Sequence, residues 1–395
     1  MTPITQDPRL DELDGLEQDH VRIEELTERA DKSDLREGLS LLMSFLAVGA
    51  AITAAALVIA FNGGDDDQVV TQAPAAESSA PAAGEDHSSH EGAAFDGEVE
   101  EYQRPDPTLP APPPGEVKRF KVDVYEHVTK VSDDLPATRV WSYAVNGKFN
   151  RGTGVSEPMV VTQGDRVEIT LVNGGSEAMD VKFPHSIDYH SSEVAPNEAF
   201  KSIQPGQTHE FSFVAKHPGV FMYHCATDPV LMHTGAGMVG MMVVKPKNLA
   251  PVDRELWMTQ QEFYIGAEGQ DADPAKMAEK DPDVLAFNGY AAQYKDQPIS
   301  VNRGETIRMY VMNAGPSIWS AFHVIGTVFD RTMVEGTPGR HAQTINLAPS
   351  QGGWVEFTLD EEGSYPFVTH AFGDMVKGAV GVLATANAPK AAMEH

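Results

Sequence analysis

Two hydrophobic patterns divide this chain near residue 117. Before that point, one uncharged apolar run at 38–61 separates a charged segment, 1–37, from a Pro-, Ala- and acid-rich segment, 62–116. After it, short strand-like stretches alternate with Gly, Pro and Asn turns, which favours β-sandwiches. We therefore predict an all-β protein that is preceded by a transmembrane helix and a disordered linker.

The apolar run has the dimensions of a membrane anchor. Its 24 residues, at about 1.5 Å each, would cross a bilayer core of roughly 30 Å. Arg29, Lys32 and Arg36 precede it and three aspartates, 65–67, follow, so the N-terminus is expected in the cytoplasm. A cleaved signal peptide is the alternative, but the long acidic leader favours an uncleaved anchor with the folded part extracellular or periplasmic.

The strand-rich part contains one pattern twice. Segments 146–147, 164–173 and 240–244 match 288–289, 304–313 and 378–382. This repeat predicts two similar domains, 117–249 and 250–388.

Composition narrows the classes of function. The formal net charge of −29 argues against a nucleic-acid partner, which needs a basic footprint. The single cysteine excludes an intramolecular disulfide, so an exported protein of this sequence must depend on its hydrophobic core and on bound metal.

Residues 223–238 contain that cysteine within a set of metal ligands. Cys225, His233 and Met238 offer a thiolate, an imidazole and a thioether, which with one more imidazole form the ligand set of a type 1 copper site. His185 is the expected fourth ligand. Such a site indicates cupredoxin-like domains, which are Greek-key β-sandwiches, and the second copy lacks the cysteine that type 1 copper needs.

Strand geometry predicts a second metal site beside the first. Neighbouring side chains of a strand point to opposite faces, so His224 should face away from Cys225. The odd offset between His185 and His190 separates these two residues as well, and Asp188 shares the side of His190. The outward residues predict a metal site about 10 Å from the first, connected to it through the His224–Cys225 peptide.

The second site needs a third protein ligand if it is to keep one open position. His370 has the corresponding place in the second domain, and we expect it to arrive from a neighbouring subunit in a closed ring. His323 would then lie over the open position and form an acid/base pair with Asp188. A hydrogen-bonded core histidine is the alternative for His323, and His127, His209, His217 and His341 are interpreted as surface residues.

These segments resemble the copper-containing nitrite reductases, which are trimeric, NO-forming enzymes with two blue-copper-type domains. The matching segments are 185–190, 224–238, 322–326 and 368–379, within a similarity that covers about 117–388. Residues 191–196 depart from the Gly-rich segment usual in the family, and a membrane anchor is not typical of it.

The resemblance implies a homotrimer with two coppers per subunit and nitrite as the substrate. It assigns type 1 copper to His185, Cys225, His233 and Met238, type 2 copper to His190, His224 and the neighbour's His370, proton management to Asp188 and His323, and the substrate pocket to Ile325. An electron from a redox donor protein would pass from type 1 copper through Cys225–His224 to type 2 copper, releasing NO and water.

Two other functions stay open. A laccase-like multicopper oxidase would reduce dioxygen, but its copper cluster needs His-x-His pairs, and the fourteen histidines contain none. A type 1/type 2 enzyme with another small substrate is a variant of the leading hypothesis. A non-catalytic, anchored electron carrier would leave the outward histidines unused.

Overall fold

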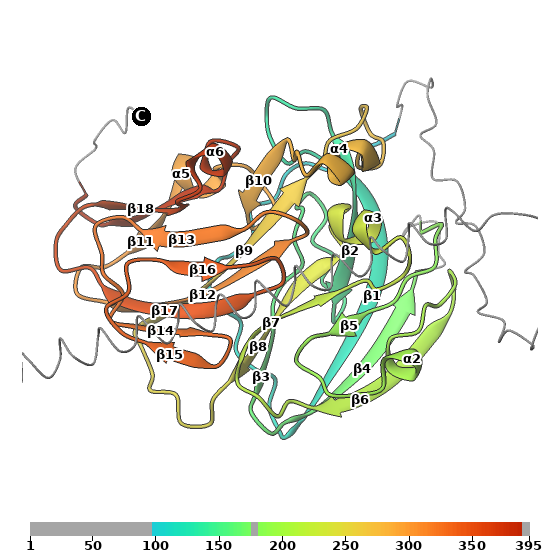
Figure 1. The fold of residues 1–395 in the computed structure, drawn as a ribbon, viewed down its shortest axis with the longest axis horizontal. Coiled ribbons are helices and arrows are strands. Elements are labelled where there is room, and N and C mark those ends of the chain that lie inside the picture. The colour runs from blue at the N-terminus through green and yellow to red at the C-terminus, as the bar shows by residue number, and fades with distance from the viewer. Residues whose placement is uncertain (1–96, 175–180, 389–395) are drawn as a thin grey trace, which may run out of the picture. The chain divides into compact units, whose positions relative to one another are not determined.

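Strands are the main regular elements of the structure, a computed structural model that describes residues 97–174 and 181–388 (Figure 1). These residues belong to one structural unit, Pro81–His395. The predicted all-β class is confirmed for them. The predicted transmembrane segment 38–61 lies outside the described residues, as does 1–37. No described helix is both long enough and apolar enough to cross a membrane.

The first domain, cyan to yellow-green in Figure 1, is a sandwich of two four-stranded sheets. One sheet has the order β2-β1-β4-β6, with β1 Val117–Thr129, β2 Thr138–Val145, β4 Arg166–Asn173 and β6 Thr208–Val214. The other has the order β3-β8-β7-β5, with β3 Met159–Thr162, β5 Asp188–Tyr189, β7 Gly219–His224 and β8 Val239–Lys245. In β4 every second side chain is buried, so its period-2 pattern turns Val167, Ile169 and Leu171 into the core.

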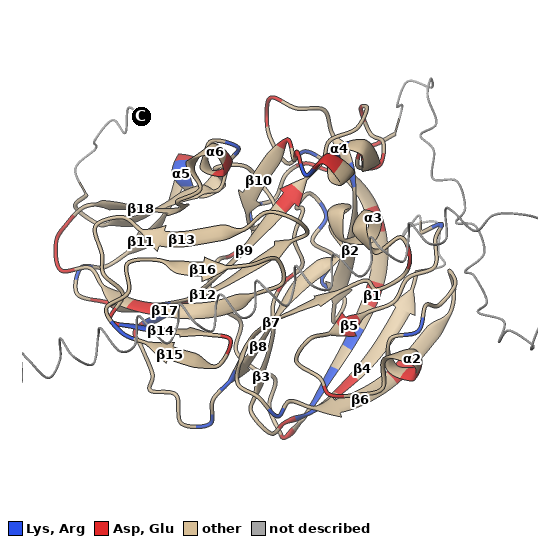
Figure 2. Ribbon diagram, viewed as in Figure 1, with Lys and Arg blue, Asp and Glu red and all other residues tan. Residues whose placement is uncertain are grey.

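The second domain repeats this arrangement with larger sheets. The six-stranded sheet contains β9 Arg254–Phe263, β10 Val284–Phe287, β12 Thr306–Gly315, β14 Arg331–Val334, β15 Thr337–Gly339 and β17 Gly352–Thr358. The five-stranded sheet contains β11 Gln297–Val301, β13 Ser320–Val324, β16 Ile345–Leu347, β18 Ser364–Thr369 and β19 Val380–Thr385. The short helices are α2 Pro196–Ala199, α3 Val230–Gly235, α4 Pro274–Glu279, α5 Gln293–Asp296 and α6 Phe372–Met375. Asp and Glu occur in both domains (Figure 2).

The repeated segments occupy equivalent strands. The segment at 164–173 contains β4, which pairs in parallel with the first strand β1. The segment at 304–313 contains most of β12, which pairs in parallel with β9. Similar sequence therefore builds the same strand pairing twice.

The two domains pack through apolar side chains that a single sandwich would leave exposed. Met222, Met241 and Val243 from the first domain form one buried cluster with Trp257 and Tyr310 from the second. Because β12 is covered on both faces, nearly all of its side chains are buried. This contact holds β7, the strand that ends at His224, against the second domain.

The prediction of a disordered linker over 62–116 is wrong for residues 97–116, which contact both domains. This segment, which we call the strap, bridges Thr129 through Glu100 and Leu256 through Thr108. The Trp257 indole also donates to the Asp106 carbonyl at 2.9 Å. Because its backbone groups find partners in both domains, a proline-rich segment is fixed here without joining a regular sheet.

Candidate metal centres

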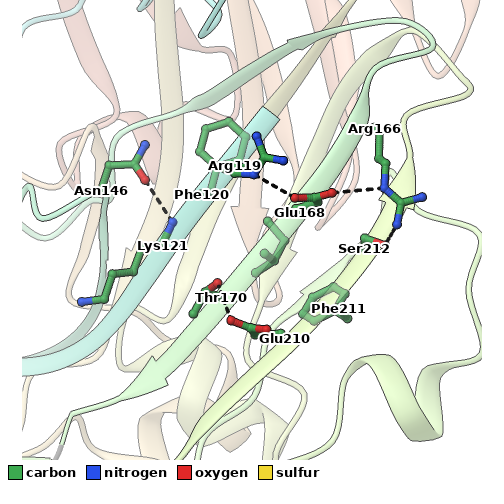
Figure 3. A pocket seen from close by; sticks show the side chains of 11 residues that line it. Arg119, Phe120, Lys121, Asn146, Arg166, Glu168, Thr170, Glu210, Phe211 and Ser212 are labelled. Atoms are coloured by element: carbon green, nitrogen blue, oxygen red, sulfur yellow. Dashed lines mark hydrogen bonds and ion pairs between the residues drawn. The ribbon is translucent and has the colours of Figure 1, made fainter. Parts of the chain in front are cut away.

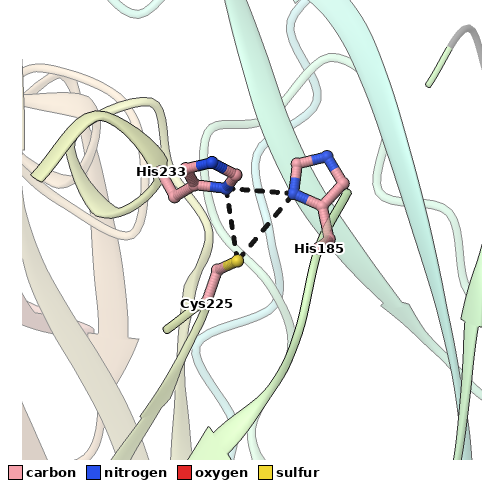
Figure 4. Close-up of side chains that lie close together, drawn as sticks. All are labelled: His185, Cys225 and His233. Atoms are coloured by element: carbon pink, nitrogen blue, oxygen red, sulfur yellow. Dashed lines mark hydrogen bonds between the residues drawn. The ribbon is translucent and has the colours of Figure 1, made fainter. Parts of the chain in front are cut away.

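Three buried side chains converge where β7 ends. Cys225 follows β7, His233 lies in α3, and His185 precedes β5. The Cys225 Sγ lies 3.2 Å from His233 Nδ1 and 3.8 Å from His185 Nδ1, and the two nitrogens are 3.1 Å apart (Figure 4). Burial, and next the neighbouring His233, lower the pKa of His185 to about 3. One sulfur and two imidazole nitrogens therefore face one point, a donor set that suits copper.

Met238 is brought beside this set by the turn after α3. Its N–H donates to the His233 carbonyl, and its carbonyl accepts from Cys225 N–H, each at 3.1 Å. Gly237 makes the turn with φ 114°, and a Cβ there would lie 2.8 Å from a Val140 methyl. Met238 is fully buried in the core that contains Cys225.

The Cys225 sulfur also receives a backbone donor. Ser186 N–H lies 3.4 Å from Sγ, and the Ser186 hydroxyl accepts from Ala226 N–H at 2.9 Å. The Tyr143 hydroxyl donates to the Ser186 carbonyl at 2.6 Å. These bonds tie the segment that bears His185 to the strand end that bears Cys225.

A second cluster lies on the other side of the same strand pair. The antiparallel pairing of β5 with β7 places Asp188 opposite His224. His224 Nε2 is 3.1 Å from His190 Nε2 and 4.0 Å from the Asp188 carboxylate. The His224 Nδ1–H donates to the Cys225 carbonyl at 2.8 Å, which leaves Nε2 as the ligand atom.

This second cluster is open to solvent. His190 is exposed, in contrast to the buried histidines of the first cluster. Burial lowers the pKa of His190, His224 lowers it further, and Asp188 opposes both. These imidazoles can bind a metal, but the described part of the chain brings only two of them to this cluster.

His370 and His323 form a separate pair on the second domain. His370 follows β18, His323 lies in β13, and their rings stack with centroids 5.1 Å apart. His323 Nδ1–H donates to the Gln343 carbonyl. Burial lowers the pKa of His323, and the Gln343 carbonyl opposes that shift. Among the described residues, His370 belongs to neither three-residue ligand cluster. Ile325, two residues after His323, is exposed.

An open depression on the first domain is unrelated to these clusters. It lies on the face of β1, β4 and β6 (Figure 3). Glu168 pairs there with Arg119 and Arg166, and Thr170 donates to Glu210. Since these charges satisfy one another, the depression presents no obvious ligand site.

Two residues were not anticipated from the sequence. His127, interpreted as a surface residue, is buried, and its Nε2 lies 3.2 Å from the Thr153 carbonyl. Trp141 contacts both histidines of the first cluster, with ring centroids 5.4 Å from His185 and 5.0 Å from His233. Neither contact has a sequence spacing that could reveal it.

The fold and the buried Cys–His–His set, with Met238 beside it, define a two-domain protein of the blue-copper class. A family model described as multicopper oxidase matches residues 128–249. The chain is 36% identical over 278 residues to the copper-containing nitrite reductase of Neisseria gonorrhoeae, covering 67% of each chain. It is 27% identical over 283 residues to that of Neorhizobium galegae, covering 64% of this chain and 71% of the relative. This chain belongs to the copper-containing nitrite reductase family.

Solved structures agree. The copper nitrite reductase of Nitrosomonas europaea superimposes with a TM-score of 0.62 at 28% identity, covering 69% of this chain and 94% of that chain. The enzyme of Thermus scotoductus SA-01 gives 0.59 at 30% identity, with coverages of 70% and 63%. A multicopper oxidase at 23% identity, with a TM-score of 0.58, shares the fold.

Proposed function

We propose that this protein is a copper-dependent enzyme that reduces nitrite to nitric oxide. The observation that carries the proposal is the pair Cys225 and His224. These neighbours contribute to two separate ligand clusters on opposite sides of one strand end. Their peptide gives a short covalent path between a buried electron site and an open substrate site. Membership of the nitrite reductase family supports this function.

The buried cluster would hold type 1 copper through His185, Cys225, His233 and Met238. The outward cluster would hold type 2 copper through His190, His224 and His370 of a neighbouring subunit. Bound copper supplies a one-electron couple at the first site and a Lewis acid at the second. The protein contributes imidazole nitrogens, a sulfur shielded from water and an opening toward solvent at His190.

A homotrimer would supply the missing imidazole. His370 is exposed, and apolar side chains of its domain are exposed too: Trp319, Val328, Phe372 and Val376. Phe372 contacts the His370 ring edge-on, with centroids 5.0 Å apart. Exposed apolar surface of this kind is typical of a subunit interface. The contact would join the second domain of one chain to the first domain of the next.

Proton transfer falls to Asp188 and His323. Reduction of nitrite by one electron consumes two protons and releases nitric oxide and water. The Asp188 carboxylate lies 4.0 Å from His224 Nε2, at the mouth of the outward cluster, where it can receive and pass on a proton. The Gln343 carbonyl fixes the His323 ring by accepting from Nδ1–H, so Nε2 is free to exchange the second proton. Ile325 would line the substrate pocket.

The proposal also includes the surroundings of the enzyme. A redox protein would donate the electron, and residues 38–61 would anchor the chain in a membrane. The copper domains would then lie on the extracellular or periplasmic side, as the charges flanking this segment favour.

The test uses the copper-loaded full chain and its His370→Ala variant, with His217→Ala as the control because His217 is exposed and its partner among the described residues is the surface residue Glu193. We expect two copper EPR signals and NO release from nitrite with a reduced artificial donor. His370→Ala should lose the type 2 signal and NO release but stay blue.

Other outcomes are decisive. Two copper signals without NO release would indicate that the enzyme acts on another small substrate. A type 1 signal alone would indicate an electron carrier. Loss of the blue colour in His370→Ala would refute the division of ligands between the two sites.

A further inference from the structure

The Trp141 indole packs edge-on against both imidazoles of the buried cluster. Its centroid lies 5.4 Å from His185 at 76° and 5.0 Å from His233 at 79°. These distances and angles are those of favourable T-shaped aromatic pairs. Trp141 is fully buried in β2, and it supplies none of the metal-binding atoms of the cluster. One side chain therefore contacts two ligands that are 48 residues apart in sequence.

The second domain of the same chain holds this indole in place. Trp141 Nε1–H donates to the Asp271 carboxylate at 3.0 Å, and Arg139 lies 3.8 Å from the same carboxylate. Phe183 stacks against the indole, with centroids 5.3 Å apart. The indole thus has a hydrogen bond at one edge and a ring against its face, which leaves it little freedom to rotate.

The segment that carries Asp271 also covers the ligand helix. Its Tyr264, Ala272 and Met277 belong to the core cluster that contains Cys225. Met277 lies so close to α3 that a Cβ on Gly235 would be 2.7 Å from its Cε. Residues 264–283 of the second domain therefore form part of the wall around the first domain's metal cluster.

His185 lacks the usual means of fixing a ligand ring. Histidine ligands generally donate their second ring N–H to a carboxylate or a carbonyl, which sets the plane of the ring. The His185 Nε2 is buried, and no described protein group forms a hydrogen bond with it. Packing against Trp141 is then a principal constraint on this imidazole.

We propose that Trp141 is a positioning residue for type 1 copper. It fixes the planes of His185 and His233, and through Asp271 the second domain sets the electronic properties of the copper site in the first. This inference rests on the proposed function, since it requires type 1 copper at the buried cluster.

The test compares copper-loaded full chains that carry Trp141→Leu, Trp141→Phe or Asp271→Ala. Trp257→Leu is the matched control, because Trp257 is also buried and its Nε1–H also donates a hydrogen bond, in this case to the Asp106 carbonyl at 2.9 Å. We expect Trp141→Leu to change the type 1 EPR hyperfine splitting, the visible absorption and the reduction potential, with an unchanged type 2 signal. Trp141→Phe and Asp271→Ala should change the same properties less.

The control separates orientation from general destabilisation. Trp257→Leu should lower the melting temperature and leave the type 1 spectrum and potential as in the wild type. A wild-type spectrum and potential in folded Trp141→Leu would overturn the inference, and so would equal changes in Trp257→Leu. If Trp141→Leu does not fold, the other two variants decide on the same criteria. Absence of a type 1 signal from the wild type would instead refute the proposed function.

Discussion

His127 should make the stability of this protein depend on pH between about 4 and 6.5. It lies on β1 with 4% of its surface exposed and stacks on Tyr125, with centroids 5.1 Å apart at 20°. Burial lowers its pKa from 6.5 to about 4, while the Thr153 carbonyl opposes the shift. The folded protein therefore keeps this imidazole neutral at pH values where the unfolded chain binds a proton.

The sign and the size follow from that difference. Between the two pKa values the unfolded state binds about one more proton, so the free energy of unfolding falls as the pH falls. A shift of roughly 2.5 pKa units, at about 1.36 kcal/mol each, corresponds to about 3.4 kcal/mol. This contribution is fully present above pH 6.5 and is lost on acidification to about pH 4.

The assay is urea unfolding of metal-free protein from pH 4 to 7, comparing the wild type with His127→Gln. Glutamine keeps an N–H donor for the Thr153 carbonyl but does not titrate, and removal of copper excludes acid release of the metal. Other titrating groups act equally on both proteins, so their difference in unfolding free energy isolates His127. We expect this difference to change by about 3 kcal/mol in favour of the variant as the pH falls. Parallel curves would refute the reasoning.

Two further predictions concern the strap and the buried charges of the second domain. Gly152→Ala should lower the melting temperature and speed proteolysis of the strap, because the new Cβ would lie 1.9 Å from the Glu101 carbonyl oxygen. Gly147→Ala is the control, since Gly147 has nearly the same positive φ but a Cβ there would have no atom within 4 Å. This control should lower the unfolding free energy only by the backbone effect of about 1–2 kcal/mol. Arg308→Met should lower the unfolding free energy by about 3–5 kcal/mol in urea titrations, because it leaves the Glu356 carboxylate buried without its nearest guanidinium; an unchanged midpoint would contradict this.

Local periodicity explains why much of the site could be predicted. The alternation of a strand needs only neighbouring residues, so the separation of His224 from Cys225 can be expected from sequence. The structure adds the pairing of β5 with β7, which brings Asp188 opposite His224. The repeat similarly predicts a second sandwich and the place of His370 at the end of a strand.

Contacts between distant segments could not be predicted in this way. Trp141 and Tyr143 are two residues apart in a strand, so both side chains can be expected to point inward, but this alternation does not reveal which side chains Trp141 contacts there. Its partner Asp271 lies 130 residues further along the chain. Such a contact depends on how the two domains pack.

The prediction of a disordered linker was wrong at the strap for a related reason. Proline-rich, polar composition indicates a segment that cannot form its own core, and this is correct locally. It does not reveal whether another surface supplies partners. Here the carbonyl of Asp106 accepts from Trp257, and Gln103 N–H donates to the Gly152 carbonyl at 2.8 Å.

The second domain has no cysteine, yet its side chains approach the two candidate ligand clusters from two directions. Asp271 and Met277 reach the buried cluster of their own chain through Trp141 and α3. His370, exposed on the same domain, is in our proposal a ligand for the neighbouring chain. One sandwich would therefore orient the electron site of its own subunit and complete the substrate site of the next. Both tasks need a rigid domain pair, because a small rotation of the second domain would displace Asp271 and His370 together. The apolar interface around β12 and the strap that crosses it supply that rigidity.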